Sequence, residues 1–327
     1  ADQRGDRRHL LALPALDPSG VPATLSPAII GKLLRGDLGF RGLAITDAMD
    51  MRGVLDGYGA VEAAQRAVAA GADVLIQPED ARATIDAIVA GVESGRYPAS
   101  RVADAARRVL GVKARLAAGR SQGLDVAAIR GIVGTTAHRA LADTIAARAF
   151  TLVQDTRGAV PLVRGARVLS VTVARRADLF AGNAFDATLR AAGCRVRSVF
   201  IDADAGTVTE YSAARAYADS ADAVVVGSYV ATRWDAASMA QSSAFVGFMD
   251  ALVGTPHGPV LVAFGNPYLL QQVPGVSAYA VAWSGGAAAQ TAAARALVGS
   301  SAIAGTLPIS IPPVAVRGTG LRRGGTR

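Results

Sequence analysis

The stretch AITDAMDM, residues 44–51, decides how the rest of this 327-residue sequence is interpreted. Its first three residues are apolar or small and are typical of a buried strand. The chain then places two acids and two methionines within five positions. Asp47 follows the strand directly, so we expect it at the carboxyl end of a parallel strand, where α/β folds bind ligands. Asp47 is the first candidate for chemistry, although an aspartate at a strand end also caps turns.

Strands and helices alternate around this stretch. Apolar runs predict strands at 9–13, 42–46 and 73–76, and capping residues and periodicity predict helices at 27–38, 59–71, 79–94 and 101–117. Alternation at this spacing indicates right-handed βαβ crossovers and a parallel sheet.

The pattern weakens at residues 118–134, which contain four glycines. We place the domain boundary there and expect a first domain at 1–119, a linker with a connecting helix at 120–149, and a second domain at 150–327. Strands of the second domain are expected near 150–155, 167–173, 195–201, 222–227, 259–264 and 278–283, with helices at 177–192, 207–220, 235–253 and 286–298. Val-rich strands of this kind are buried on both faces, which favours an open α/β/α sandwich.

The composition excludes several classes of protein. Lys and Arg total 34 against 26 Asp and Glu, giving a net charge of +8, but the arginines are scattered and no aromatic stripe accompanies them. We therefore expect no nucleic-acid partner. A single cysteine, Cys194, excludes an internal disulfide. No run approaches the roughly 20 apolar residues of a membrane span, and the sequence specifies no compartment.

Histidine and serine offer few candidates for chemistry. His9, His138 and His257 lie far apart and form no HExxH or HxH arrangement, so we expect no metal site. His9 heads the first predicted strand and is a candidate pocket residue. No GxSxG elbow supports a serine nucleophile, and neither GxGxxG nor GxxxxGK supports nucleotide binding.

The residues beside Asp47 have two interpretations each. Asp50 is expected to form a turn or a cap. Met49 and Met51 are expected to pack in the core, but one of them lies beside the acid however the turn runs, and Met51 is the candidate for contact with a substrate.

One family resembles this sequence over nearly the whole chain, from about residue 10 to residue 321. The segment 10–51, LLALPALDPSGVPATLSPAIIGKLLRGDLGFRGLAITDAMDM, closely resembles glycoside hydrolase family 3, in its β-N-acetylglucosaminidase branch, where barrel strand six leads into strand seven. AGADVLIQPED (70–80) resembles the eighth strand. FTLVQDTRGAVPL (150–162), FGNPYLL (264–270) and AGTLPISIP (304–312) resemble landmarks of the C-terminal sandwich.

The resemblance implies an α/β fold in which a partial (β/α)8 TIM barrel, about the last three βα units, precedes an α/β/α sandwich. It implies that Asp47 is the catalytic nucleophile, which forms a covalent glycosyl-enzyme during retaining hydrolysis. The implied substrates carry terminal β-linked N-acetylglucosamine, as in cell-wall or muropeptide-type glycosides. Met51 and His9 are then the candidate substrate-binding residues, and no cofactor is needed.

The sequence departs from the family before residue 9. The family's sugar-binding Arg and Lys, and its KHFPGHG loop with the Asp-His acid/base pair, precede strand six, and ADQRGDRR (1–8) contains none of them. A closed barrel needs eight strands and roughly 250 residues. We therefore expect the acid/base residue to be absent from this chain. We also expect the open barrel edge to pair with a complementing N-terminal fragment or to self-associate.

Two alternatives remain open. The first is a catalytically silent, truncated family 3 remnant that acts as a carbohydrate-binding or scaffold protein. The second is a β-glucosidase of the same family, which differs in its preference for the sugar.

Overall fold

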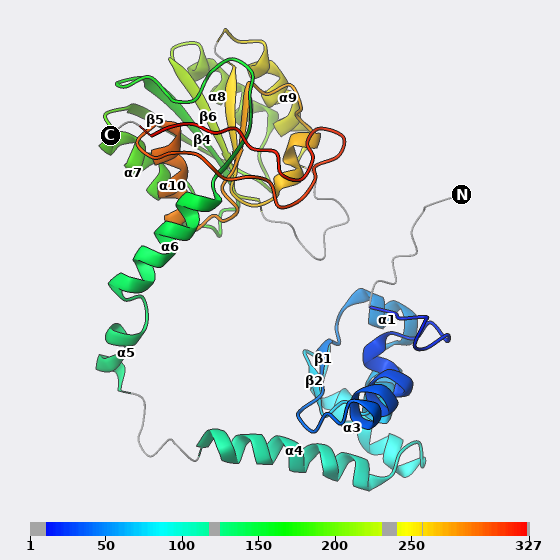
Figure 1. Cartoon of the computed structure of the whole chain (residues 1–327). Helices are drawn as coiled ribbons and strands as arrows, with labels where there is room; N and C mark the ends of the chain where they lie inside the picture. Colours follow the sequence, from blue (N-terminus) through cyan, green and yellow to red (C-terminus); the bar gives the residue numbers. More distant parts are fainter. Residues whose placement is uncertain (1–10, 118–124, 231–240, 257, 326–327) are drawn as a thin grey trace. The chain divides into compact units, whose positions relative to one another are not determined.

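The computed structural model describes residues 11–117, 125–230, 241–256 and 258–325. The chain divides into two compact units, residues 1–124 and 125–327. The first unit contains one short strand pair among helices, and the second contains a six-stranded sheet between helices (Figure 1). The expected α/β class is thus confirmed, whereas the domain limits drawn from the sequence stay a prediction.

Local sequence signals determine the helices of the first unit. Ser26 begins the helix η2, where its hydroxyl accepts a hydrogen bond from the Ile29 amide at 3.2 Å. Asp80 caps α3 by accepting from the amide of Arg82 at 2.8 Å. Gly71 ends α2 with a φ of 118°, which favours glycine. The elements are η1 (Ala23–Leu25), η2 (Pro27–Asp37), β1 (Ile45–Ala48), α1 (Arg52–Tyr58), α2 (Ala60–Ala70), β2 (Val74–Ile76), α3 (Ala81–Glu93) and α4 (Ala99–Ala117).

The strands β1 and β2 form a parallel pair, as the βαβ pattern predicts. Ile45 pairs with Val74 and Ala48 with Ile76, and an irregularity lies between these two positions. The strand predicted at 9–13 is wrong over residues 11–13. Those residues form only an isolated antiparallel bridge between Ala12 and Pro22, because the described chain offers them no neighbouring strand.

The second unit contains the six-stranded sheet. Its strands are β3 (Thr151–Asp155), β4 (Arg167–Ala174), β5 (Arg195–Asp202), β6 (Ala223–Ser228), β7 (Pro259–Ala263) and β8 (Ala278–Val281). Its helices are α5 (Val126–Ile132), α6 (Thr136–Ala149), α7 (Asn183–Ala191), α8 (Val208–Ala218), α9 (Ser243–Val253), η3 (Pro267–Gln271) and α10 (Ala287–Leu297). The strand order is β3-β8-β7-β6-β4-β5, and all neighbours are parallel except β3 and β8.

Helices cover both faces of this sheet, so the expected sandwich is confirmed. One face packs against α7 and α10, with Phe185 and Leu297 in its core. The other packs against α8 and α9, with Tyr211 and Phe248 in its core (Figure 1). The central strands β6, β7 and β8 are almost wholly buried, which explains their continuous apolar sequences.

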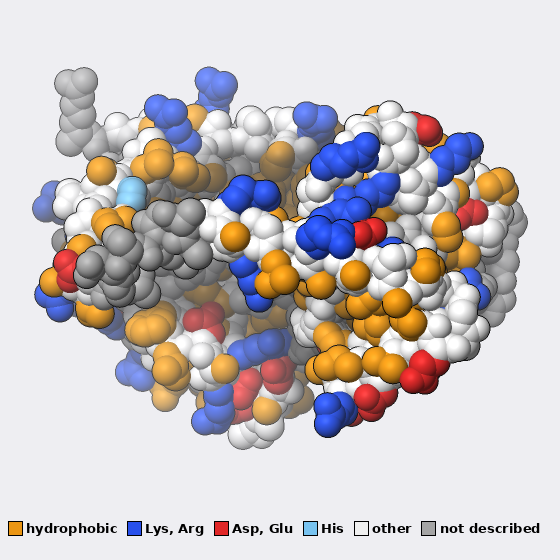
Figure 2. All heavy atoms as spheres, turned by 90° about the horizontal axis from the view of Figure 1, so that it is seen from below, with side chains coloured by type: hydrophobic (Ala, Val, Ile, Leu, Met, Phe, Trp, Pro, Cys, Tyr) orange, Lys and Arg blue, Asp and Glu red, His pale blue; other side chains and the backbone are white. Residues whose placement is uncertain are grey.

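The surface in Figure 2 shows Lys and Arg side chains dispersed among hydrophobic ones, with fewer acids. Several large apolar side chains are exposed, and Phe180 and Leu179 are exposed to 77% and 74%. Within the described ranges, no helix has the length and apolar character needed to cross a membrane.

Candidate active site at the end of strand β1

The alternation of β1 determines where Asp47 lies. Thr46 points inward and is buried, and its hydroxyl accepts a hydrogen bond from the Ile76 amide of β2 at 3.1 Å. Successive side chains of a strand point to opposite faces, so Asp47 is exposed. Its carboxylate accepts a hydrogen bond from the amide of Ala48 at 2.8 Å. Asp47 therefore lies near the carboxyl end of β1 and does not cap a helix.

The chain beyond Asp47 is fastened to the end of the neighbouring strand. The Met49 amide donates to the Ile76 carbonyl at 2.9 Å, and the Asp50 amide donates to the Gln77 carbonyl at 3.1 Å. The Gln77 side-chain amide returns a hydrogen bond to Asp50 Oδ2 at 2.9 Å. Asp50 thus lies in a turn, which is one of the two roles expected for it, and its side chain bonds to Gln77 directly after β2. It does not cap α1, because that helix has no side-chain cap.

Two unusual features mark this bond. Gln77 has a φ of 48°, which is uncommon for a residue other than glycine. Asp50 Oδ1 is buried and has no hydrogen-bond partner in the described structure. Strained backbone and unsatisfied polar atoms cluster at functional sites. Our sequence analysis missed Gln77, although its position directly after VLI (74–76) corresponds to that of Asp47 after LAIT.

The side chains of Met49 and Met51 contribute mainly to the hydrophobic core. Met49 is 5% exposed and lies in a core cluster with Leu25 and Val54. Met51 is half-buried and packs against the same cluster, so only part of its side chain remains for a ligand. Its proposed contact with substrate stays a prediction.

The other candidate, His9, lies outside the described residues. Within the described ranges, no group of three or more His, Cys, Asp or Glu side chains could hold a metal ion.

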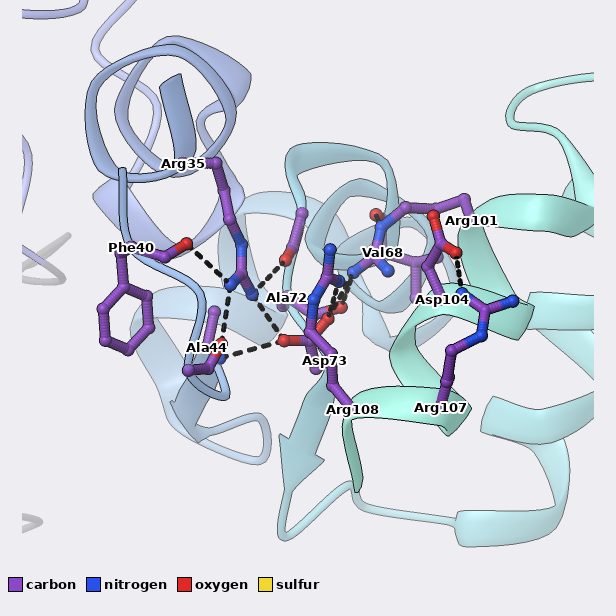
Figure 3. Close-up of polar contacts among 12 residues, drawn as sticks. Arg35, Phe40, Ala44, Val68, Ala72, Asp73, Arg101, Asp104, Arg107 and Arg108 are labelled. Carbon is purple, nitrogen blue, oxygen red and sulfur yellow. Dashed lines mark hydrogen bonds and ion pairs between the residues drawn. The ribbon is translucent and has the colours of Figure 1, made fainter. Parts of the chain in front are cut away.

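A buried ion cluster anchors the opposite end of the strand pair. Asp73, directly before β2, has a fully buried side chain that pairs with Arg35, Arg101 and Arg108, the last at 2.9 Å (Figure 3). Asp73 also accepts a hydrogen bond from the Ala44 amide at 3.1 Å, directly before β1.

These contacts join helices η2 and α4 to the amino ends of both strands. Burial lowers the pKa of the Arg101 guanidinium, although the charge of Asp73 opposes this effect. In α/β barrels, the amino ends of the strands serve stability and the carboxyl ends serve chemistry. The sequence analysis missed this cluster, because its four members are dispersed between positions 35 and 108.

The arrangement presents one carboxylate with the chemistry of a nucleophile. An exposed carboxylate at a strand end can attack an electrophilic carbon. Among the described residues, however, no other side chain forms a hydrogen bond or an ion pair with Asp47. The larger cavities described are lined by other residues.

Known proteins resemble this chain in both sequence and structure. Residues 8–112 match the family described as the glycosyl hydrolase family 3 N terminal domain. The beta-N-acetylglucosaminidase/beta-glucosidase of Cellulomonas fimi is 29% identical over 144 residues, which cover 44% of this chain and 26% of that protein. Beta-hexosaminidase A of Pseudoalteromonas piscicida is 28% identical over 187 residues, which cover 51% and 31%. The chain thus spans less than a third of the length of either relative.

A solved structure extends the resemblance to the second unit. The glycoside hydrolase family 3 beta-N-acetylglucosaminidase from Paenibacillus sp. str. FPU-7 matches with a TM-score of 0.73 and 28% identity, covering 88% of this chain and 54% of that one. The resemblance to family 3 that the sequence predicts is therefore confirmed. This chain spans about half of that structure.

Proposed function

We propose that Asp47 is the nucleophile of a retaining glycoside hydrolase that releases terminal β-linked N-acetylglucosamine. The observation that supports this most directly is the exposed carboxylate in β1, which, among the described residues, accepts a hydrogen bond only from the adjacent backbone amide of Ala48. The resemblance of residues 8–112 to family 3 supplies the reaction class. The names of the Cellulomonas and Paenibacillus proteins suggest the sugar.

The reaction proceeds in two displacements. An oxygen of the Asp47 carboxylate attacks the anomeric carbon, and the bond from that carbon to the leaving-group oxygen breaks as the oxygen takes a proton from a general acid. This step leaves a glycosyl ester on Asp47. Water then attacks the same carbon, the ester bond breaks, and the former acid takes the proton of the water. Two inversions restore the β configuration.

The acid/base residue of this reaction comes, in our proposal, from outside the described residues. A retaining pair is separated by about 5–5.5 Å. The four glutamates of the chain offer no recognisable acid loop, and Glu62 is already bound to Arg66 and Arg96. A polypeptide segment that adds strands beside β1 is the partner we propose for this role. General acid catalysis typically contributes about 10²–10⁴-fold, so its loss alone would strongly reduce turnover.

Asp50 and Gln77 act as positioning residues in this scheme. They join the chain after Asp47 to the end of β2 through the 2.9 Å hydrogen bond. A catalytic carboxylate must be held to within a fraction of an ångström of its attacking position. Because the chain segments after β1 and β2 are joined by this hydrogen bond, the backbone at Asp47 can move less.

Leaving-group dependence tests this proposal on the whole chain. A 2,4-dinitrophenyl β-N-acetylglucosaminide has a leaving group that needs little protonation, so its cleavage depends mainly on the nucleophile. We expect the chain to cleave it, and to cleave the corresponding alkyl glycoside at least about 10²-fold more slowly. Asp47→Ala abolishes cleavage, whereas Asp56→Ala, an exposed aspartate of α1 in the same unit, leaves it unchanged.

A second candidate function follows from the contacts of Asp47, which bonds to no other side chain within the described ranges. A silent remnant would bind carbohydrate, or act as a scaffold, without turnover. It predicts no cleavage of the dinitrophenyl glycoside by either the parent chain or the Asp47→Ala variant. The β-glucosidase alternative predicts faster cleavage of the glucoside than of the N-acetylglucosaminide. Either result would overturn the proposed activity in a distinguishable way.

A further inference from the structure

A cavity in the second unit lies at the carboxyl edge of the parallel sheet. It has a volume of about 450 Å³. Two loops form it, the loop from β4 to α7, which contributes Asp178 and Phe180, and the loop from β8 to α10, which contributes Gly285 and Gly286. Ligands of open α/β sheets bind at this edge, and ligand pockets typically measure about 300–1,000 Å³. Nothing in the comparisons assigns a role to this cavity.

A single buried side chain fixes the two loops against each other. Gln290 of α10 is 1% exposed and also lines the cavity. Its oxygen accepts hydrogen bonds from the amides of Ala184 and Phe185, at 3.0 and 3.2 Å. Its nitrogen donates to the carbonyls of Phe180 and Gly285, at 3.0 and 2.7 Å. The cavity is therefore preorganised, which lowers the entropic cost of binding a ligand.

The backbone beside the cavity is strained. Trp283, two residues before Gly285, has a φ of 64°. Its indole nitrogen donates to the carbonyl of Ala149 at 2.9 Å, which holds it in this conformation. This conformation is unfavourable for a residue other than glycine, and such residues cluster at ligand sites. The strained residue thus lies in the loop from β8 to α10, which also lines the cavity.

The side chains that line the cavity offer hydrogen-bond acceptors and one apolar surface. Phe180 is 77% exposed and presents its ring without a packing partner in the core. The Asp178 carboxylate has no hydrogen bond or ion pair within the described ranges. Asn183 donates to the Leu179 carbonyl at 3.1 Å, which leaves its side-chain oxygen as an acceptor. A ligand that fits these groups carries several hydroxyl donors and one apolar face.

The electrostatics of the cavity favour a neutral ligand over a cation. Residues at the amino ends of α7 and α10, Asn183 and Ala287, line it, and helix amino ends carry partial positive charge. This charge offsets the single carboxylate of Asp178. The first turn of α10 also has no side-chain cap, so its amides remain available as donors to a ligand.

We propose that this cavity binds a neutral pyranose ring, whose carbon-bearing face packs on Phe180 and whose hydroxyls bond to Asp178 and Asn183. The site is a binding site of the sandwich unit and performs no chemistry. It does not depend on the role proposed for Asp47.

Ligand-observed NMR on the whole chain tests the site. The probes are N-acetylglucosamine and methyl β-glucoside, and tetramethylammonium serves as the cationic probe. We expect saturable sugar binding with a dissociation constant of about 1 mM, weakened about tenfold by Phe180→Ala and about threefold by Asp178→Asn. The matched control is Phe200→Ala, an aromatic residue on β5 that is 48% exposed and lies outside the cavity, and it should bind as the parent does.

The outcomes separate this site from the proposed active site. Binding that persists in Asp47→Ala and weakens in Phe180→Ala supports the proposal. The proposal is overturned by an absence of saturable binding, by unchanged binding in both cavity variants, by binding lost in Asp47→Ala, or by preferential binding of tetramethylammonium. Melting curves of each variant confirm that the sandwich unit remains folded, which we expect because both substituted side chains are exposed.

Discussion

Asp47 and Asp73 lie at opposite ends of one parallel strand pair, the first near the carboxyl end of β1 and the second directly before β2. Asp73 is fully buried among arginines, whereas Asp47 is exposed. The two carboxylates therefore serve different purposes. Asp73 fixes the amino ends of the strands, and Asp47 is the carboxylate that we propose as the nucleophile.

Replacing Asp73 should destabilise the first unit more than replacing a surface residue does. Asp73→Asn removes the negative charge that Arg35, Arg101 and Arg108 share, and two of these arginines are largely buried. We expect a loss of about 3 kcal/mol or more in the free energy of unfolding, because a broken buried ion pair leaves uncompensated charge. Urea denaturation, followed by a probe confined to residues 11–117, measures it.

Asp104→Asn is the matched control for that experiment. Asp104 pairs with Arg107 one turn away on α4, and both side chains are largely exposed. Such surface pairs contribute little. If Asp104→Asn and Asp73→Asn reduce stability equally, the buried cluster does not anchor the strands.

The pKa of Glu62 should lie well below its ordinary value. Hydrogen bonds from Arg96 first, and then from Arg66, lower the pKa of the Glu62 carboxyl to about 2 from 4.5. A lowered pKa in the folded state stabilises the fold above the unfolded-state value. That contribution is lost as the pH falls from about 4.5 to about 2.

NMR titration of the glutamate carboxyl carbons checks this value. Arg96→Gln should raise the pKa of Glu62 toward 4.5 and flatten the acid limb of the stability curve. Since the chain has only four glutamates, the signals are few. A Glu62 pKa that is the same with and without Arg96 would show that this pair is not formed in solution.

Gln290→Leu should destabilise the second unit while keeping the volume of the side chain similar. It removes four hydrogen bonds and leaves backbone groups of both cavity loops unsatisfied. Each buried unsatisfied group costs about 1–3 kcal/mol, so we expect a total loss of at least about 2 kcal/mol. Thermal unfolding measures the loss, and hydrogen exchange at Ala184 and Phe185 should accelerate. Unchanged exchange would contradict the bridging role of Gln290.

Gln77→Ala tests how the end of β1 is held. The change removes the hydrogen bond to Asp50 Oδ2 and leaves both oxygens of that carboxylate without a protein partner. We expect a loss of about 1 kcal/mol in stability. With the dinitrophenyl glycoside, the change should lower kcat and leave KM nearly unchanged, since Gln77 positions Asp47 without touching the sugar. An effect on KM alone would argue against a positioning role.

The sequence predicts the sandwich well, because the signals for its strands and helix ends lie in consecutive residues. The apolar runs are buried strands at β6, β7 and β8, and capping residues and glycine begin and end helices near the expected positions. The antiparallel pairing of β3 with β8 was not predicted, since the direction of a pairing depends on tertiary contacts rather than on periodicity.

The candidate site at the end of β1 could be predicted only in part, because some of its contacts join residues that lie far apart in the sequence. The position of Asp47 after a buried strand can be read from consecutive residues. The partnership of Asp50 with Gln77 spans 27 positions, and that of Asp73 with Arg35 spans 38. Such pairs leave no periodic signal in the chain. The strand predicted at 9–13 fails over residues 11–13, because an apolar run alone does not provide a partner strand.

Covalent trapping tests the role of Asp47 most directly. The chain is incubated with 5-fluoro-β-N-acetylglucosaminyl fluoride, whose fluoride leaves without a general acid and whose ring fluorine slows hydrolysis of the ester. Digestion and mass spectrometry then locate the adduct. We expect one glycosyl ester, on Asp47, that is absent from Asp47→Ala and present in Asp56→Ala. An adduct on another carboxylate, or none while Asp47 is intact, would contradict it.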